Sequence, residues 1–230
     1  MLSDLQFMEL HTAVAFRHDA DGRLLAINEP KPDRPAPRLY LGRTTSGNIW
    51  RFRHDLPDNL VQKLDAVLRT EPAATDLHEP PAVLPALIDA LRPIRELTQG
   101  PAWQVLERLP SPYGVVPITT ANVAVCQRYF PWTAAHLDDL QPCRAVVADG
   151  DAVSLCFSSR NATEACAAGV FTVEEYRGHG YAPVVVASWA NAVREMGRVP
   201  FYSTAWDNLA SQAVAQKLGL VLYGADLSIL

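Results

Sequence analysis

Hydrophobic positions follow a helical period in some stretches of the chain and a strand-like pattern in others. After Pro57, apolar residues recur at helical spacing through Leu68, and a second helical stripe covers about 82–98. Apolar runs separated by turn residues predict one β-hairpin over 7–29 and another over 39–53. These elements predict a small α/β unit at the start of the chain.

A more regular succession of elements is predicted from about Ile118 onward. Apolar runs around an Asp-Gly-Asp turn predict antiparallel strands, which end in a central strand over 165–173. An amphipathic helix that stops at Gly197 follows, and then a strand over 200–206. Because a helix separates these two strands, they should run parallel to each other.

The fold class predicted from this pattern is α/β, with two units along the chain. Residues 1–100 are expected to form an N-terminal α/β unit of unknown role, and residues 101–230 a second unit. The proline-rich stretch 101–117 is interpreted as the transition between them. A helix up to Leu218 and a last strand from Val221 are expected to complete the second unit.

A glycine-containing loop follows the predicted central strand. The loop reads Arg177-Gly178-His179-Gly180, and Tyr181-Ala182-Pro183 can begin a helix because proline is tolerated in a first helical turn. Unpaired amides and the positive end of the helix dipole then point at one spot. This arrangement favours an anion, and a cofactor that carries phosphate is the expected ligand.

The stretch 169–182 resembles the acyl-CoA pyrophosphate loop of the GNAT superfamily of N-acetyltransferases. The family motif has Arg or Gln, then Gly, then Gly or Ala, and Arg177, Gly180 and Ala182 occupy these places. A second block, Asn208 to Ser211 followed by Lys217 to Leu220, is similar to the family's penultimate helix and the turn after it. The resemblance covers about residues 118–230.

This resemblance implies a mixed central sheet flanked by helices, in which two neighbouring parallel strands diverge and hold acetyl-CoA between them. Backbone groups of the central strand would pair with the pantetheine arm, and an amide near Phe171 or Val173 would polarise the acyl carbonyl. The loop would hold the pyrophosphate. The cofactor-binding residues implied are Phe171, Thr172, Val173, Arg177, Gly178, His179, Gly180, Tyr181, Ala182, Asn208 and Ser211.

The chain departs from the family pattern at the residue expected to protonate the leaving thiolate. Many members carry a tyrosine seven residues after the asparagine, but this chain has Ala215 there. A thiolate is a fairly good leaving group, so water or another hydroxyl, such as that of Ser211 or Tyr223, would suffice.

A general base is required because an alkylamine is mostly protonated at neutral pH. Glu164, at the start of the central strand, is the first candidate; its alternative interpretation is a glutamate on the surface. Glu174 and Glu175 come second and Asp207 third. The side chain of His179 is expected to face water while its amide serves the phosphate.

Composition excludes several other classes of protein. A net charge of −5 without a basic run argues against a nucleic-acid partner. The four cysteines lack CxxC spacing, so no metal is expected and buried free thiols in a reducing cytoplasm are the preferred interpretation. No uncharged apolar stretch of membrane-spanning length and no signal-peptide pattern is found.

The function predicted is an N-acetyltransferase that moves an acetyl group from acetyl-CoA to a primary amine of a small molecule or peptide, by direct transfer in a ternary complex. The alternative is a non-catalytic acyl-CoA-binding module whose N-terminal half binds a partner or ligand. Turnover distinguishes the two. The acceptor is not identified by the sequence, and a homodimer formed through the strand from Val221 is a further expectation.

Overall fold

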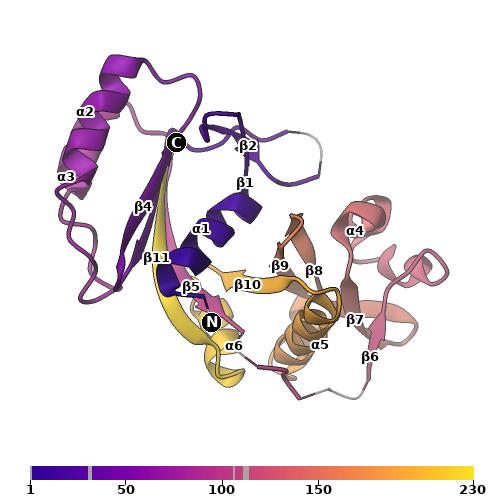
Figure 1. The fold of residues 1–230 in the computed structure, drawn as a ribbon. Coiled ribbons are helices and arrows are strands. Elements are labelled where there is room, and N and C mark those ends of the chain that lie inside the picture. Colours follow the sequence, from indigo (N-terminus) through magenta and orange to yellow (C-terminus); the bar gives the residue numbers. More distant parts are fainter. Residues whose placement is uncertain (1, 31–32, 106, 111–113) are drawn as a thin grey trace.

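One mixed β-sheet takes strands from both halves of the chain in the computed structural model. The structure describes residues 2–30, 33–105, 107–110 and 114–230. The nine strands of this sheet lie in the order β4-β3-β11-β5-β10-β9-β8-β7-β6, and a separate two-stranded sheet is formed by β1 and β2 (Figure 1). The predicted α/β class is therefore confirmed.

The chain begins with a helix where the sequence analysis predicts a strand. Helix α1 spans Asp4–Ala15, and Ser3 and Gln6 form a capping box at its start. Strands β1 (Phe16–His18) and β2 (Leu24–Ile27) then form a short hairpin. The hairpin predicted over 7–29 is thus wrong for its first half, because the apolar residues of α1 pack on a sheet that sequence periodicity does not reveal.

The next predictions are largely confirmed. Strands β3 (Leu39–Thr44) and β4 (Gly47–Phe52) form the expected hairpin, and α2 (Asp58–Leu68) follows Pro57 as expected. The helix predicted over 82–98 is shorter, since α3 covers only Leu84–Ala90.

Strand β5 (Leu97–Gln104) replaces the end of that predicted helix and the start of the predicted transition. It is an inner strand, paired with β10 on one side and β11 on the other. Pro101 has no N–H to donate, but its carbonyl accepts a hydrogen bond from the Thr204 amide (3.4 Å). Partners distant in sequence therefore stabilise a strand whose local composition favours a loop.

The remaining elements follow the predicted order, except that a short strand over 115–117 lies within the predicted transition. They are β6 (Val115–Pro117), the 3₁₀ turn Val123–Cys126, α4 (Pro131–Ala135), the 3₁₀ turn Leu137–Leu140, β7 (Cys143–Ala148), β8 (Asp151–Asn161), β9 (Ala165–Thr172), the 3₁₀ turn Glu174–Tyr176, α5 (Tyr181–Glu195), β10 (Val199–Ser203), α6 (Leu209–Lys217) and β11 (Val221–Ile229).

The C-terminal strand β11 joins the two halves of the chain. It pairs antiparallel with β3 on one side and β5 on the other. Residues 1–100 and 101–230 therefore share one sheet, and the predicted boundary falls inside β5; a division into two functional units stays a prediction. Strand β11 pairs with β5 from Val221 to Ile229 but with β3 only from Ala225 to Ile229, and a homodimer through this strand stays a prediction.

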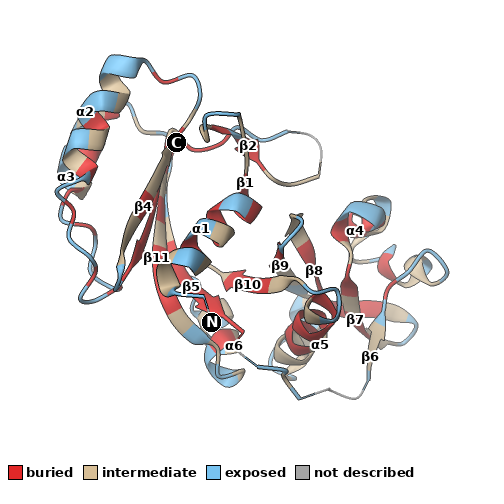
Figure 2. Ribbon diagram, in the orientation of Figure 1, coloured by how far each residue is buried: buried red, intermediate tan, exposed pale blue. Residues whose placement is uncertain are grey.

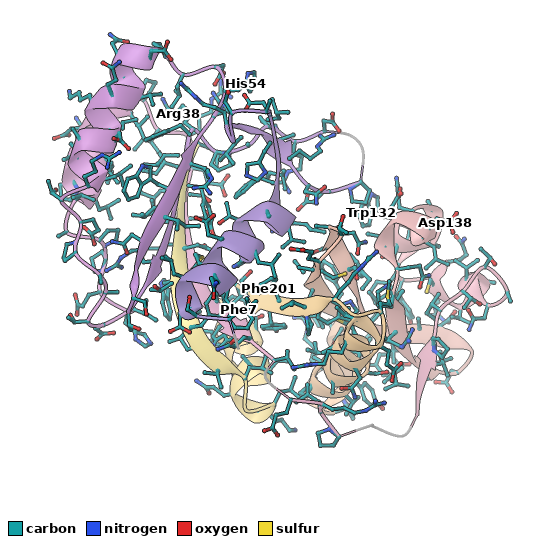
Figure 3. The ribbon with its side chains drawn as sticks, in the orientation of Figure 1. Phe7, Arg38, His54, Trp132, Asp138 and Phe201 are labelled. Atoms are coloured by element: carbon teal, nitrogen blue, oxygen red, sulfur yellow. The ribbon has the colours of Figure 1, made fainter. Side chains whose placement is uncertain are left out.

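Helices cover both faces of the sheet around β9 and β10. On one face, here called the α1 face, α1 packs against Phe201 of β10, and the ring centroids of Phe7 and Phe201 are 6.2 Å apart (Figure 3). On the opposite face, the α5 face, α5 packs against Tyr202. Figure 2 shows that α1 carries both buried and exposed residues, whereas α5 is buried or intermediate along its length except at Glu195.

Candidate functional site

The two parallel strands β9 and β10 separate part of the way along their length. Their paired residues are Val199 with Ala165, Pro200 with Cys166, and Phe201 with Ala167. Strand β9 then continues to Thr172 and β10 to Ser203 without further pairing between them. The edge of β9 from Ala168 to Thr172 therefore presents backbone groups with no strand beside them on this side.

The direction of the β9 amides decides which of them face the gap. The Val173 N–H donates to the Val153 carbonyl of the neighbouring chain segment (2.9 Å), so it points away from the gap. Amides alternate along a strand, so Phe171 has the same direction as Val173, whereas Val170 and Thr172 point toward the gap. Of the amides near the predicted position, those of Val170 and Thr172 therefore face the gap, whereas those of Phe171 and Val173 do not, and a polarising role for any of them stays a prediction.

The side chain of Phe171 lies on the face opposite α5. Its ring stacks on Phe157 with centroids 6.0 Å apart. The Phe157 ring centroid in turn lies 6.3 Å from that of Trp132, a residue of α4 labelled in Figure 3. Phe171 is 57% exposed. The Thr172 hydroxyl, by contrast, is 2.8 Å from the Ser154 hydroxyl, so Thr172 is anchored to β8.

The glycine loop leads directly from β9 into α5. Gly178 and Gly180 have φ angles of +81° and +77°, which favour glycine strongly. Gly180 is the N-cap of α5 and has no side chain to satisfy the first helical amides, which are left for a ligand. A Cβ placed on Gly180 would lie 3.5 Å from Lys217 Nζ, so this ammonium group of α6 lies beside the loop.

The side chains of the loop leave its amides accessible. Arg177 is exposed and its Nε donates to the Thr172 carbonyl (3.4 Å). His179 is also exposed; its Nδ1 lies 3.0 Å from the Arg177 carbonyl, and its ring stacks on Tyr181. The histidine therefore braces the loop, as expected of a residue whose amide rather than side chain serves the ligand. Ala182 continues the first turn of α5.

Asn208 and Ser211 begin α6 beside the end of β10. The Asn208 side-chain oxygen accepts a hydrogen bond from the Ser211 amide (3.0 Å), which is N-capping geometry. The amide group of Asn208 is exposed and retains its N–H donors for a ligand. The Ser211 hydroxyl is 2.7 Å from the phenol of Tyr202 on β10.

Tyr202 is a residue that the sequence analysis missed. Burial raises its pKa to about 12, although the hydrogen bond with Ser211 lowers it, so the phenol stays protonated at neutral pH. The signal in the sequence was the alternation of side chains along β10, because Tyr202 has to face α5 and α6 when Phe201 faces α1. Ala215 is fully buried next to Tyr202 in the same cluster.

The second hydroxyl suggested from the sequence, Tyr223, lies elsewhere. It packs on the α1 face, and its phenol is 2.8 Å from His11 Nδ1 of α1. Of the two hydroxyls suggested from the sequence, that of Ser211 therefore lies on the α5 face, where it pairs with Tyr202, and that of Tyr223 does not.

Glu164 is exposed and lies before the first residue of β9, at the paired end of the strand. Its carbonyl accepts a hydrogen bond from the Val199 amide (2.8 Å). The glycine loop is at the opposite end of β9. Glu174 and Glu175 form an exposed 3₁₀ turn between β9 and the loop, and Asp207 is exposed just before α6.

Other chemistries find little support within the described part of the chain. No cluster of three or more metal-binding side chains occurs among these residues. All four cysteines are free and buried, and burial raises the pKa of Cys156 and, to about 12, that of Cys143, which keeps both thiols protonated. None of the helices described is long and apolar enough to cross a membrane.

Comparison with known proteins agrees with this geometry. Residues 144–225 match the family model for GNAT acetyltransferases, so the resemblance to this superfamily is confirmed over a segment from β7 to β11. A search of curated proteins gives no match.

Solved structures show the same fold. A GCN5-related N-acetyltransferase-like protein from Streptococcus suis aligns with a TM-score of 0.50 at 16% identity, covering 85% of each chain. A GNAT-family acetyltransferase from Colwellia psychrerythraea aligns with a TM-score of 0.50 at 13% identity, covering 79% of this chain and 75% of that one. A GNAT-family structure from Novosphingobium aromaticivorans aligns with a TM-score of only 0.49 at 18% identity, over 59% of this chain and 65% of that one, and the likeness in fold does not rest on it.

Proposed function

Because residues 144–225 are a GNAT acetyltransferase region, we propose that this protein is an N-acyltransferase that uses acetyl-CoA as its acyl donor and a primary amine as acceptor. The observation that carries the proposal is the end of pairing between β9 and β10 at Ala167 and Phe201, next to a glycine loop at the start of α5. An extended thioester-bearing arm fits beside an unpaired strand edge, and a pyrophosphate fits at a helix N-terminus.

Binding is assigned as follows. The amides of Gly178 to Ala182 hold the pyrophosphate, and the ammonium group of Lys217 beside Gly180 adds a positive charge. The pantetheine arm lies along Ala168 to Thr172 and contacts Asn208. Val173 belongs to the wall of this site, although its own amide is used within the sheet.

Acyl transfer then needs three protein contributions. An amide of Val170 or Thr172 donates to the thioester carbonyl oxygen and stabilises the negative charge that develops as the amine attacks. Ser211, hydrogen-bonded to the protonated Tyr202, donates a proton to the departing thiolate. A carboxylate accepts a proton from the amine, and Glu164 is the candidate predicted from the sequence. No covalent enzyme intermediate is needed.

The test is calorimetric titration with acetyl-CoA and CoA, followed by thiol release with a panel of amines. Micromolar binding together with amine-dependent release of free CoA is the expected result. Binding without release above background would indicate the non-catalytic acyl-CoA-binding module instead. The absence of binding to both ligands would refute the assignment of the loop.

A further inference from the structure

A cavity of about 300 Å³ opens on the α1 face of the sheet, next to the point where β9 and β10 separate. Part of its wall is Ser203, Thr204 and Ala205, which come after Phe201, the last residue of β10 that pairs with β9. Ser203 faces the same side as Phe201, two residues earlier, and Phe201 packs against α1. The cavity and the groups assigned to acyl-CoA thus lie on opposite faces of one gap.

The carboxyl group of Asp226, which has no hydrogen-bond or ion-pair partner among the described residues, lines this cavity. Asp226 of β11 lies between Gly42 of β3 and Gly100 of β5 in the sheet, so neither neighbour has a side chain to cover it. Among the described residues, no ion pair or hydrogen bond reaches its carboxyl group. A Cβ on Gly100 would collide with the Thr204 carbonyl, so glycine is required for the close approach of the segment after β10.

A positive group faces the cavity from the other side. Arg160 of β8 donates through one terminal nitrogen to Glu29 (3.0 Å), while its buried Nε has no partner among the described residues. Glu29 also pairs with Arg34, another lining residue (3.2 Å). Two guanidinium groups therefore share one carboxylate, which leaves excess positive charge at this wall.

The wall contributed by α1 is neutral. His11 is buried, its ring stacks on Phe201 with centroids 5.1 Å apart, and its Nδ1 is bonded to the Tyr223 phenol. Burial and the charge of Arg160 lower the pKa of His11 to about 3, so the imidazole is uncharged at neutral pH. The cavity is thus lined by the carboxyl group of Asp226 and the guanidinium group of Arg160, with a neutral wall nearby, and the exposed residue Glu96 also lines it.

We propose that this cavity binds the acceptor, and that the acceptor is a small zwitterion of the amino-acid type, with its amine at Asp226 and its carboxylate at Arg160. The inference rests on the proposed function, whose acyl donor would reach the same gap from the α5 face. The volume is at the lower end of small-molecule sites, which suits a free amino acid or a dipeptide.

Asp226 also supplies the proton acceptor that the reaction needs. Burial raises its pKa to about 7, against the opposing effect of Arg160, so the carboxylate form is available just above neutral pH and is a stronger base than an ordinary aspartate. It takes one proton from the ammonium group. The neutral amine then forms the C–N bond, the C–S bond breaks, and the second nitrogen proton goes to the thiolate by way of Ser211, which gives an amide and free CoA.

The experiment compares each common L-amino acid with its α-amide and with the corresponding amine that lacks the carboxylate. Thiol release is measured with acetyl-CoA, and binding of the amino acid to the protein with CoA is measured by calorimetry. We expect kcat/KM for the preferred amino acid to exceed that for its amide at least about tenfold, as expected for a charge-assisted hydrogen bond. In Arg160→Gln this preference should fall below about threefold, by the same reasoning.

Variants at the carboxylates separate the candidate bases. Asp226→Asn should lower kcat by about 100-fold, the lower range for loss of a general base, while the affinity for acetyl-CoA stays unchanged and so reports a folded protein. Arg69→Gln, at an exposed ion pair with Asp65, is the matched control for Arg160→Gln and should behave as the wild type. If Glu164→Gln abolishes turnover and Asp226→Asn does not, Asp226 is not the base.

The outcomes distinguish this inference from the proposed function. Equal use of amino acids, amides and simple amines, with no effect of Arg160→Gln, would overturn the zwitterion site but leave the acyltransferase intact. Failure to bind acetyl-CoA would refute the proposed function, whereas amino-acid binding that is lost in Arg160→Gln would still support the cavity assignment.

Discussion

Replacing Gly180 with valine is the sharpest test of the acyl-CoA loop. Gly180 has φ +77°, a conformation that costs an L-residue about 1–2 kcal/mol and more for a β-branched one. Its new Cβ would lie 3.5 Å from Lys217 Nζ, so the valine methyl groups would displace the ammonium group, the loop backbone, or both. Either displacement changes the donors offered to the pyrophosphate.

The expected loss of affinity can be bounded. Loss of one or two charge-assisted hydrogen bonds, at about 1.5–3 kcal/mol each, weakens acetyl-CoA binding at least about tenfold. Calorimetry measures the dissociation constant, and chemical denaturation measures the free energy of unfolding. We expect the unfolding free energy to fall by only about 1–2 kcal/mol, which leaves the protein folded.

Gly197 provides a matched control at the other end of the same helix. It has φ +74°, and a Cβ there would meet nothing within 4 Å. Gly197→Val should therefore cause a similar loss of stability with unchanged affinity for acetyl-CoA. If both variants weaken binding equally, the effect reflects general destabilisation, and if neither does, the loop does not bind acyl-CoA.

Three further predictions concern the acid, the cavity and the first helix. Tyr202→Phe removes the phenol beside Ser211 and should lower kcat about tenfold or more with little change in KM for acetyl-CoA, measured by thiol release. Because the pKa of Asp226 is raised in the folded protein, the unfolded chain loses this proton at lower pH than the folded protein does. The free energy of unfolding should therefore fall as the pH rises from about 4 to 7, and this fall should vanish in Asp226→Asn, as measured by denaturation at each pH. Ser3→Ala removes the capping box of α1 and should cost about 1 kcal/mol of unfolding free energy, measured by denaturation.

Each of these has a control or a contrary result. Tyr129→Phe should leave kcat unchanged, and a normal kcat in Tyr202→Phe would exclude a role in proton donation. The other titratable groups near Asp226 are those of Arg160, His11, Tyr40 and Tyr223, and Glu96 lines the same cavity. The pKa of His11 is lowered to about 3 and burial raises those of both tyrosines, so an unchanged pH profile in Asp226→Asn would contradict the assignment. Unaltered stability of Ser3→Ala would show that α1 is held by packing alone.

Local signals in the sequence were sufficient for the loop and the elements around it. Gly178 and Gly180 occupy left-handed conformations that few other residues tolerate, and Asn208 caps α6 in a way that depends only on its own helix. The parallel arrangement of β9 and β10 followed from the helix between them. These features could be predicted because the interactions responsible are short in sequence.

Contacts between distant segments decided the rest. Strand β5 is rich in residues that favour a loop, yet β10 and β11 pair with it, and α1 forms where an isolated pattern indicates a strand. Asp226 and Arg160 come together only because β11 enters the sheet between β3 and β5 and the chain after β10 bends past Gly100. The sequence by itself thus determined the glycine loop at the start of α5. The cavity on the opposite face exists only in the tertiary structure, because Asp226 and Arg160 come from strands that no local pattern places together.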